Sequence, residues 1–343
     1  MAKWVVTGGA GFIGANVVRA LADRGVQSVV IDNLSRPSTK LNLEWLEQEC
    51  ARAFSLVKAD VRDHRAVEEA LRAHADAEAV LHLAGQVAVT RSVENPREDL
   101  ETNVVGTVNV LEATRRHAPS AVVVNVSSNK VYGDFRTHRI VETPTRYVDL
   151  DWPDGLDETH PLDPSSPYGC SKAAADCYTS AFAHAYGLRA ISLRQSCVYG
   201  QRQFGVEEQG WVAWLVFAAH LGLPITVFGT GKQARDLLHV DDLVALYVRV
   251  VERADVVAGQ AYNVGGGPAN VLSVLELLER LGNPPADYAD ARVGDQKVFV
   301  ADCSRVRADF GWEPATAVDD GLERLQAWVA DHAAAAARVL QPT

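Results

Sequence analysis

The chain has 343 residues, of which 48% are hydrophobic and 22% are charged, and its formal net charge is −11. This length allows one large domain or two closely packed ones. The acidic balance argues against a general nucleic-acid-binding protein, because phosphate neutralisation requires clustered Lys and Arg. No apolar run is long enough to span a bilayer and the N-terminus leads directly into a strand pattern, so we expect a cytoplasmic protein without a membrane partner.

The cysteines do not form a pattern typical of a metal site or a disulfide framework. There is no C-x-x-C pair, and no cysteine has metal-like spacing with a histidine. We therefore expect no structural metal, no disulfide, and reduced thiols that are mostly buried. The cysteines are Cys50, Cys170, Cys177, Cys197 and Cys303.

The first half of the chain alternates β-branched runs with amphipathic stretches, which is typical of a parallel sheet with crossover helices. Candidate strands lie at residues 3–8, 28–33, 54–60, 79–85, 121–128 and 190–196. Apolar residues recur at helical spacing at residues 12–25, 65–74 and 100–118. This order of elements predicts an α/β fold with a doubly wound, Rossmann-type parallel sheet.

The pattern loosens from about residue 200, and a smaller mixed α/β lobe is predicted there. Candidate strands lie at 225–229, 235–240, 261–266 and 297–303, and candidate helices at 240–254 and 317–340. We predict a Rossmann domain at residues 1–200 and 233–262, and a C-terminal substrate lobe at residues 201–232 and 263–343. Segment 134–167 is longer than a normal connection, which predicts an ordered loop beside a site or, alternatively, a disordered excursion.

A glycine motif, TGGAGFIG at residues 7–14, follows the first candidate strand and opens the first helix. Gly8, Gly11 and Gly14 allow a tight turn, close approach of a pyrophosphate and packing of the helix on the strand. The next strand ends at Asp32, where a carboxylate can accept both ribose hydroxyls of an adenosine and repels a 2′-phosphate. The motif therefore predicts NAD rather than NADP, although Arg36 could support NADP.

A candidate catalytic pair lies in SPYGCSK at residues 166–172. Tyr168 and Lys172 are four residues apart at the start of a predicted helix and so share one face. An ammonium group beside a phenol favours the phenolate, so we expect a lowered pKa at Tyr168 and proton exchange with a hydroxyl. Ser128, at the end of the fifth candidate strand, could hold the same hydroxyl by a hydrogen bond.

Four sequence blocks together resemble the extended short-chain dehydrogenase/reductase family of nucleotide-sugar epimerases and dehydratases. They are the glycine motif, SSNKVYG at 127–133, YGCSK at 168–172 and RQSCVYG at 194–200. The resemblance implies a tightly held NAD that oxidises a sugar hydroxyl, followed by epimerisation, dehydration or decarboxylation. It also implies Ser128, Tyr168 and Lys172 as the catalytic trio, a role for Asn103 in shaping the central helix near the cofactor, and a homodimer or homotetramer.

The predicted cofactor residues follow from the glycine motif, the strand ends and this resemblance. They are Gly8, Gly11, Phe12, Ile13, Asp32, Asn33, Ser35, Arg36, Asp60, Val61, Leu83, Ala84, Gly85, Asn103, Val126, Tyr168, Lys172 and Cys197.

The residues after Ser128 bear on which sugar chemistry is expected. Dehydratases of the family carry an Asp-Glu pair there as acid and base, whereas this chain has Asn129 and Lys130, which cannot fill both carboxyl roles. Further blocks, including HLAGQVAVT at 82–90 and GKQARDLLHVDDL at 231–243, are similar to family members that invert C2 of a CDP-activated hexose. One departure is Ser128 itself, where we expect threonine; either hydroxyl can donate.

The matched blocks also predict a nucleotide-sugar site. Arg235 and Arg292 are candidates for the pyrophosphate, because a planar guanidinium binds phosphate oxygens in pairs. Lys130 could reach the cofactor or the sugar, or could only neutralise Asp134. The predicted substrate residues are Gln86, Ser128, Asn129, Lys130, Gln201, Arg202, Gln209, Trp211, Val227, Arg235, Arg292 and Gln296.

Two other functions remain open from the sequence. A UDP-sugar 4-epimerase would share the trio and the cofactor chemistry and would differ only in the pose of the sugar. A non-catalytic, NAD-sensing regulator would keep the fold, although such proteins commonly lose the Tyr or the Lys.

Overall fold

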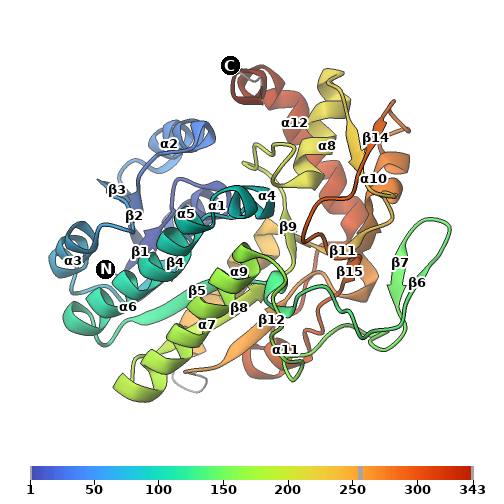
Figure 1. The fold of residues 1–343 in the computed structure, drawn as a ribbon. Helices are drawn as coiled ribbons and strands as arrows, with labels where there is room; N and C mark the ends of the chain where they lie inside the picture. The colour runs from blue at the N-terminus through green and yellow to red at the C-terminus, as the bar shows by residue number, and fades with distance from the viewer. Residues whose placement is uncertain (1, 254–257, 341–343) are drawn as a thin grey trace.

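The computed structural model describes residues 2–253 and 258–340 and confirms the predicted α/β fold. A seven-stranded parallel sheet with the order β12-β8-β5-β4-β1-β2-β3 forms its centre (Figure 1). All six strands predicted in the first half of the chain belong to this sheet. The strands are β1 Lys3–Thr7, β2 Gln27–Asp32, β3 Phe54–Lys58, β4 Ala79–His82, β5 Val122–Ser128, β8 Ala190–Gln195 and β12 Ala261–Val264.

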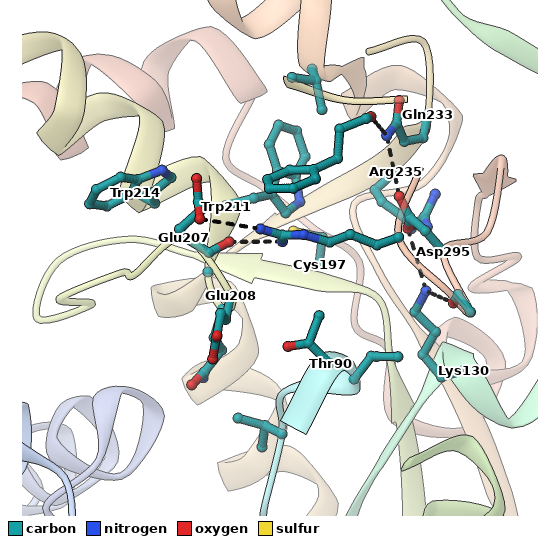
Figure 2. Close-up of a pocket in the computed structure, with 18 of the residues that line it drawn as sticks. Thr90, Lys130, Cys197, Glu207, Glu208, Trp211, Trp214, Gln233, Arg235 and Asp295 are labelled. Atoms are coloured by element: carbon teal, nitrogen blue, oxygen red, sulfur yellow. Dashed lines mark hydrogen bonds and ion pairs between the residues drawn. The ribbon is translucent and has the colours of Figure 1, made fainter. Parts of the chain in front are cut away.

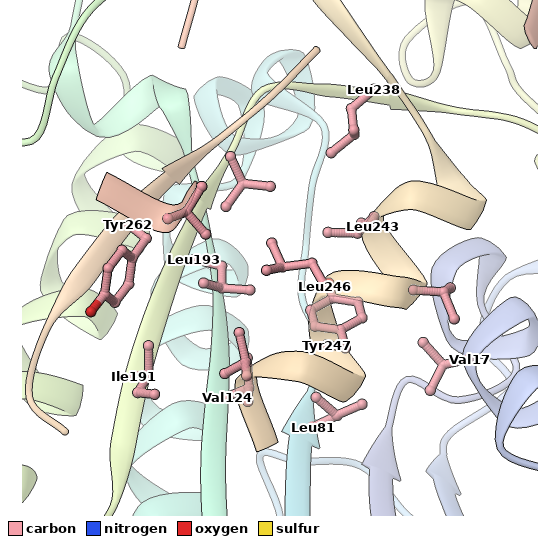
Figure 3. Packing of buried hydrophobic residues seen from close by; sticks show 14 of the residues in the cluster. Val17, Leu81, Val124, Ile191, Leu193, Leu238, Leu243, Leu246, Tyr247 and Tyr262 are labelled. Atoms are coloured by element: carbon pink, nitrogen blue, oxygen red, sulfur yellow. The ribbon is translucent and has the colours of Figure 1, made fainter. Parts of the chain in front are cut away.

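Both faces of the sheet are covered by helices, as a doubly wound sheet requires. Successive side chains of β1 point to opposite faces, so Trp4 and Val6 join one buried cluster and Val5 another. On the first face pack α1 Phe12–Asp23, α2 Pro37–Cys50, α9 Val240–Arg253 and α11 Ser304–Phe310. On the second face pack α3 His64–Ala73, α6 Gly106–His117 and α7 Pro167–Tyr186. Figure 3 shows Leu243, Leu246 and Tyr247 of α9 facing the strand residues Val124 and Leu193.

The helix predicted at 100–118 contains a π-helical turn before its regular part, α6. The short helices α4 Val89–Glu94 and α5 Pro96–Leu100 lead into a π-helical turn, Glu101–Val105, before α6 begins. Such turns disturb the regular helical spacing of side chains and often occur at functional sites. Here the turn contains Asn103, which the resemblance assigned to shaping this helix.

The C-terminal lobe has its own apolar core, which includes Val212, Phe217, Leu277 and Leu325. It contains α8 Trp211–Leu221, α10 Val274–Arg280 and α12 Val318–Leu340, together with β10 Thr226–Phe228 paired to β14 Asp287–Ala289. Figure 1 shows α8, α10, α12 and β14 together on one side of the central sheet. A second small sheet joins β13 Val271–Ser273, β11 Ala234–His239, β15 Val298–Phe299 and β9 Cys197–Tyr199.

The predicted domain division stays a prediction, and two elements do not follow it. Strand β12 continues past residue 262 to Val264 within the central sheet. Helix α11, placed in the predicted lobe, packs on β12 and α9. The helix predicted at 240–254 is α9, and its last residue, 254, lies outside the described residues.

Segment 134–167 is an ordered loop that contains a hairpin, rather than a disordered excursion. Its strands, β6 Ile140–Glu142 and β7 Tyr147–Asp149, extend along the edge of the C-terminal lobe in Figure 1. The Nζ of Lys232 lies 2.7 Å from a Glu142 carboxylate oxygen, and Thr145 and Arg146 each donate to Glu276 at 2.7 Å. The hairpin therefore ties the chain after β5 to the C-terminal lobe.

All five cysteines are free thiols, but the expectation that most are buried is wrong. Only Cys303 is buried, whereas Cys170 and Cys177 are exposed on α7. Within residues 2–253 and 258–340, no helix is long and apolar enough to cross a membrane, and no cluster of three His, Cys, Asp or Glu side chains could hold a metal.

A buried carboxylate, Asp236 on β11, joins the sheet to the C-terminal lobe. It accepts hydrogen bonds from the hydroxyl of Ser196, from the backbone N–H of Gly267 at 3.0 Å and from that of Ala301 at 3.2 Å. A Cβ on Gly265 would lie 1.9 Å from an Asp236 oxygen, so glycine is required there. Burial raises the pKa of Asp236 from 3.8 to about 6, despite these donors.

We predict that Asp236 makes folding less favourable as the pH rises. Because the pKa is raised in the folded state, Asp236 favours folding only while it is protonated. The free energy of unfolding of the wild type, relative to that of Asp236→Asn, should fall by about 2 kcal/mol between about pH 4.5 and about pH 7. Urea unfolding of both proteins measures it, and a difference that stays flat or rises with pH would contradict the assignment.

Candidate active site

Two adjoining cavities lie at the carboxyl ends of the sheet strands, where ligands bind in doubly wound folds. The larger, of about 480 Å³, follows the glycine motif and the ends of β2, β3, β4 and β5. The smaller, of about 300 Å³, lies under the C-terminal lobe. Ser128, Tyr168, Gln209 and Trp211 line both. A ligand in one cavity would therefore meet a ligand in the other at Ser128 and Tyr168.

The glycine motif forms a turn that leaves no room for side chains. Gly8 has a positive φ of +69°, and a Cβ on it would lie 2.7 Å from the backbone nitrogen of Ala84. A Cβ on Gly14 would lie 2.3 Å from the Gly8 carbonyl oxygen. The turn ends at the N-terminus of α1, whose N-cap, Gly11, has no side chain to occupy the free amides. This arrangement fits a dinucleotide pyrophosphate.

Asp32 and Arg36 both line the larger cavity. Asp32 ends β2 and accepts from the backbone N–H groups of Ala10 at 3.1 Å and Leu34 at 2.8 Å. Burial raises its pKa, and the two backbone donors oppose that rise. Arg36 donates to the side-chain oxygen of Gln209 from the C-terminal lobe. The residue that could support NADP is thus already engaged in a contact between the lobes.

Nearly all the predicted cofactor residues line the larger cavity, and Asn103 is the exception. Its buried side-chain amide donates to the Gln86 carbonyl at 3.0 Å and to the Ser171 hydroxyl at 3.0 Å. Its side-chain oxygen accepts from the Gln86 backbone N–H at 2.9 Å. Asn103 therefore joins α7 to the chain after β4, which agrees with a shaping role and not with direct contact to a ligand.

The proposed trio comes together where the two cavities meet. Ser128 is the last residue of β5; its hydroxyl donates to the side-chain oxygen of Asn129 at 3.3 Å, and its presence beside Tyr168 lowers the pKa of that phenol. Tyr168 is 8% exposed at the start of α7, where the side chain of Ser166 caps the helix by accepting from Gly169 N–H at 3.1 Å. Lys172, one turn later, donates to the Val126 carbonyl at 2.9 Å.

The expectation of a lowered pKa at Tyr168 does not hold in the protein alone. Burial raises the pKa of this phenol to about 12, although the nearby Ser128 hydroxyl and the charge of Arg36 oppose the rise. Burial also lowers the pKa of Lys172 to about 8, which weakens the cation expected to stabilise the phenolate. Sequence spacing places a lysine beside a tyrosine but does not reveal how much water both side chains lose.

The smaller cavity contains three cations. Arg235 donates to the Asp295 carboxylate at 3.1 Å and to the Gln296 carbonyl at 2.6 Å. The guanidinium of Arg292 lies 3.7 Å from the ring centre of Phe228 and donates to the Glu207 carbonyl at 2.9 Å. Figure 2 shows Lys130 and Asp295 on one side of this pocket and Glu207, Trp211 and Trp214 on the other.

Lys130 contacts the segment that carries Arg292, rather than Asp134 directly. Its Nζ donates to the Gly294 carbonyl at 3.0 Å and lies 3.6 Å from an Asp295 carboxylate oxygen. Burial lowers the pKa of Lys130 to about 8, and Arg235 adds to this effect. The neighbouring Asn129 donates to the Gln296 side chain at 2.7 Å. Both residues after Ser128 thus hold the wall of the smaller cavity.

Most of the predicted substrate residues line the smaller cavity: Ser128, Asn129, Lys130, Gln209, Trp211, Val227, Arg235 and Arg292. Gln86 lines the larger cavity instead. Gln201 and Gln296 line neither. The side chain of Gln201 donates to Asp241 at 2.7 Å, and that of Gln296 is buried and donates to the Gly133 carbonyl at 2.5 Å.

Arg202 also lines neither cavity and instead connects the lobes. Its guanidinium lies 4.6 Å from the ring centre of Trp45 and 5.7 Å from that of Trp328, on α2 and α12 respectively. It donates to the Leu41 carbonyl at 3.0 Å and to the Asn42 side chain at 3.0 Å. A buried arginine among aromatic rings is an interior packing residue, and its place next to Gln201 in the sequence does not distinguish that role from phosphate binding.

The sequence analysis did not predict several residues that line the smaller cavity, among them Glu207, Trp214, Gln233 and Asp295. Glu207 and Asp295 could have been suspected, because each lies within three residues of a predicted substrate residue. Acidic side chains, however, do not suggest a phosphate site by themselves. Their role depends on pairing with Arg292, Arg235 and Lys130, which only the folded chain reveals.

Comparison with known proteins decides the family. A sequence model of the NAD-dependent epimerase/dehydratase family matches residues 4–265. The chain belongs to this family. Its cofactor is NAD, and the larger cavity has the glycine turn and the buried carboxylate that such a dinucleotide requires.

Relatives within the epimerase/dehydratase family act on different nucleotide sugars. The chain is 39% identical to a CDP-paratose 2-epimerase from Salmonella typhi, over 95% of this chain and 98% of the relative. It is 33% identical to a dTDP-glucose 4,6-dehydratase from Xanthomonas campestris, over 96% of this chain and 93% of the relative. Among solved structures, the NAD complex of a UDP-glucose 4-epimerase from Thermus thermophilus superposes with a TM-score of 0.78 at 30% identity, over 97% of this chain and 99% of that one.

We predict that the protein binds NAD more tightly than NADP by about tenfold or more, because Asp32 repels a 2′-phosphate. Fluorescence titration of nucleotide-free protein with each dinucleotide measures the ratio. Asp32→Asn removes the negative charge and should reduce the preference. Tighter binding of NADP, lost in Arg36→Ala, would instead show that Arg36 determines cofactor choice.

Proposed function

We propose that the protein is an NAD-dependent nucleotide-sugar 2-epimerase that inverts C2 of a CDP-activated hexose of the CDP-paratose/CDP-tyvelose type. The observation that carries the proposal is that Asn129 and Lys130 are both engaged in holding the cavity wall. A dehydratase of the family would need an acid and a base at these two positions. The relative of 39% identity, a CDP-paratose 2-epimerase, supports the same reaction and nucleotide.

The chain's own residues would bind the sugar and move one proton. When bound, NAD accepts a hydride from the sugar carbon and returns it, so the reaction has no net redox change. Ser128 would hold the C2 hydroxyl by a hydrogen bond while Tyr168 takes its proton, and Tyr168 would return that proton after the 2-keto sugar has turned over. Lys172 would stabilise the phenolate, and the positive nicotinamide ring would act in the same direction.

The nucleotide part of the substrate would lie in the smaller cavity. Arg235 and Arg292 offer guanidinium groups to a pyrophosphate, and Trp211 and Val227 line the same space. The cavity's acidic residues limit the net positive charge, so the phosphates would need direct contact with the arginines. We further propose a homodimer or homotetramer, as the family resemblance implies, and a cytoplasmic location, as the N-terminal sequence pattern suggests.

A substrate panel tests the proposed reaction. The NAD-loaded protein is incubated with CDP-paratose, CDP-glucose and UDP-glucose in deuterated water, and C2 and C4 are followed by NMR. We expect inversion at C2 of the CDP-sugar without solvent deuterium at that carbon, because the same hydride returns. Inversion at C4 alone would favour a UDP-sugar 4-epimerase, and loss of water from the sugar would favour a dehydratase.

Tyr168→Phe tests the proton transfer. Turnover should fall by about 10²- to 10⁴-fold, because the variant lacks the group that takes the proton. NAD should stay bound, since the ring is retained. Tyr178→Phe is the matched control, because Tyr178 is exposed on the same helix. Equal turnover in wild type and Tyr168→Phe would contradict the assignment, and an absence of turnover in the wild type would favour an NAD-sensing regulator.

A further inference from the structure

Both arginines proposed to bind pyrophosphate are already paired with carboxylates of the chain, but they are held differently. Arg235 contacts Asp295, the Gln296 carbonyl and the Ala234 carbonyl, and Asp295 also pairs with Lys130. Arg292 has its hydrogen bond and its ion pair with one residue, Glu207. Arg235 is therefore fixed within a network, whereas Arg292 depends on one partner.

The position of the Glu207–Arg292 ion pair would allow a ligand anion to replace the carboxylate. The guanidinium lies 3.8 Å from the Glu207 carboxylate, with side-chain exposures of 24% for Arg292 and 41% for Glu207. Stacking on Phe228 holds the guanidinium plane in the cavity, so its edge can face a new acceptor without moving far. A partly exposed ion pair of this kind is weak and can be replaced by a stronger anion.

The backbone presents Glu207 at the tip of a tight turn. Val206 and Gln209 exchange two backbone hydrogen bonds, each of 2.9 Å, so Glu207 and Glu208 lie at the end of the turn. Both glutamates line the smaller cavity, but among the described residues Glu208 has no ion pair. Gln209 ties the same turn to Arg36 in the larger cavity. The contact between Gln209 and Arg36 would therefore hold the turn in place when the ion pair between Glu207 and Arg292 breaks.

We propose that Glu207 is a displaceable internal partner of Arg292, which occupies the guanidinium until a nucleoside diphosphate replaces it and thereby lowers the affinity for that ligand. The inference rests on the proposed function, since it assumes a nucleoside diphosphate in the smaller cavity. A diphosphate carries more charge than one carboxylate and offers paired oxygens that match a planar guanidinium. Each binding event must, however, break the existing ion pair and leave Glu207 near the ligand, at a cost in affinity.

The charges around Arg292 agree with this role. Facing the same cavity are the cations Lys130 and Arg235 and the carboxylates Glu207, Glu208 and Asp295. Asp295 neutralises Lys130 and Arg235 in part, so it does not compete for Arg292. Removal of the Glu207 carboxylate would therefore break the ion pair of Arg292 and leave only its hydrogen bond to the Glu207 backbone carbonyl. Glu208→Gln removes the same charge from the same turn and leaves that ion pair intact.

Calorimetric titration of CDP into the NAD-loaded protein tests the proposal, with wild type, Glu207→Gln and Glu208→Gln compared. We expect Glu207→Gln to bind CDP about two- to fivefold more tightly than the wild type, from the size of a partly exposed ion pair. Glu208→Gln should change the affinity less, because its charge acts only at a distance. The gain from Glu207→Gln should vanish in an Arg292→Gln background.

Cytidine, which lacks phosphate, separates the exchange from general changes in the cavity. Its affinity should be the same in wild type and Glu207→Gln. The proposal is overturned if Glu207→Gln does not tighten CDP binding, if cytidine gains as much as CDP, or if the gain persists without Arg292. Thermal unfolding of each variant confirms an intact fold.

The outcome is separate from that of the proposed epimerase reaction. If the substrate panel shows C4 inversion or dehydration, UDP or dTDP replaces CDP and the same comparison of Glu207 and Glu208 applies. If no nucleoside diphosphate binds the wild type or Glu207→Gln, the role of Glu207 is overturned together with the proposed nucleotide site.

Discussion

The parallel register of the central sheet is the constraint on which the site depends. Because β1, β2, β4 and β5 run in the same direction, their carboxyl ends meet at one edge. That edge brings together the turn at Gly8, the carboxylate of Asp32 and the hydroxyl of Ser128. The approach is so close that a side chain on Gly8 would collide with Ala84 of the neighbouring strand connection. The dinucleotide cavity and the proposed proton-transfer site thus result from one backbone arrangement.

Burial changes the pKa values of the site residues more than their charged and hydrogen-bonding partners do. It raises the pKa of Tyr168 to about 12 and lowers those of Lys172 and Lys130 to about 8. In the protein alone these groups are therefore biased towards their neutral forms. Charged ligands would shift that bias, since the positive nicotinamide favours the phenolate and phosphates favour the ammonium of Lys130. The charges of a bound cofactor and substrate would therefore favour the ionised forms of Tyr168 and Lys130.

The chain after β5 shows how one scaffold can serve different reactions. In this protein Asn129 and Lys130 hold the segment at 294–296, and Gln296 in turn donates to the Gly133 carbonyl. These contacts place Arg292 and Asp295 along the smaller cavity and leave no carboxyl pair beside Ser128. Under the proposed function, Asn129 and Lys130 thus stand where a dehydratase would need its acid and base, and they stabilise the wall of the smaller cavity. The turn at Glu207 closes the other side of the same cavity.

The sequence by itself determined the doubly wound sheet, the glycine turn, the strand-end carboxylate Asp32 and the spacing of Tyr168 and Lys172, because each depends on local periodicity or on residues a few positions apart. It did not separate Arg202, which packs among Trp45 and Trp328, from Arg292, which faces a cavity, because the partners and burial of an arginine depend on segments distant in the sequence. It also did not indicate that Tyr168 would lose so much water that its pKa rises. Those outcomes were decided by the tertiary structure alone, since burial and ion pairing depend on segments, such as 205–210 and 292–296, that come together only when the lobes pack.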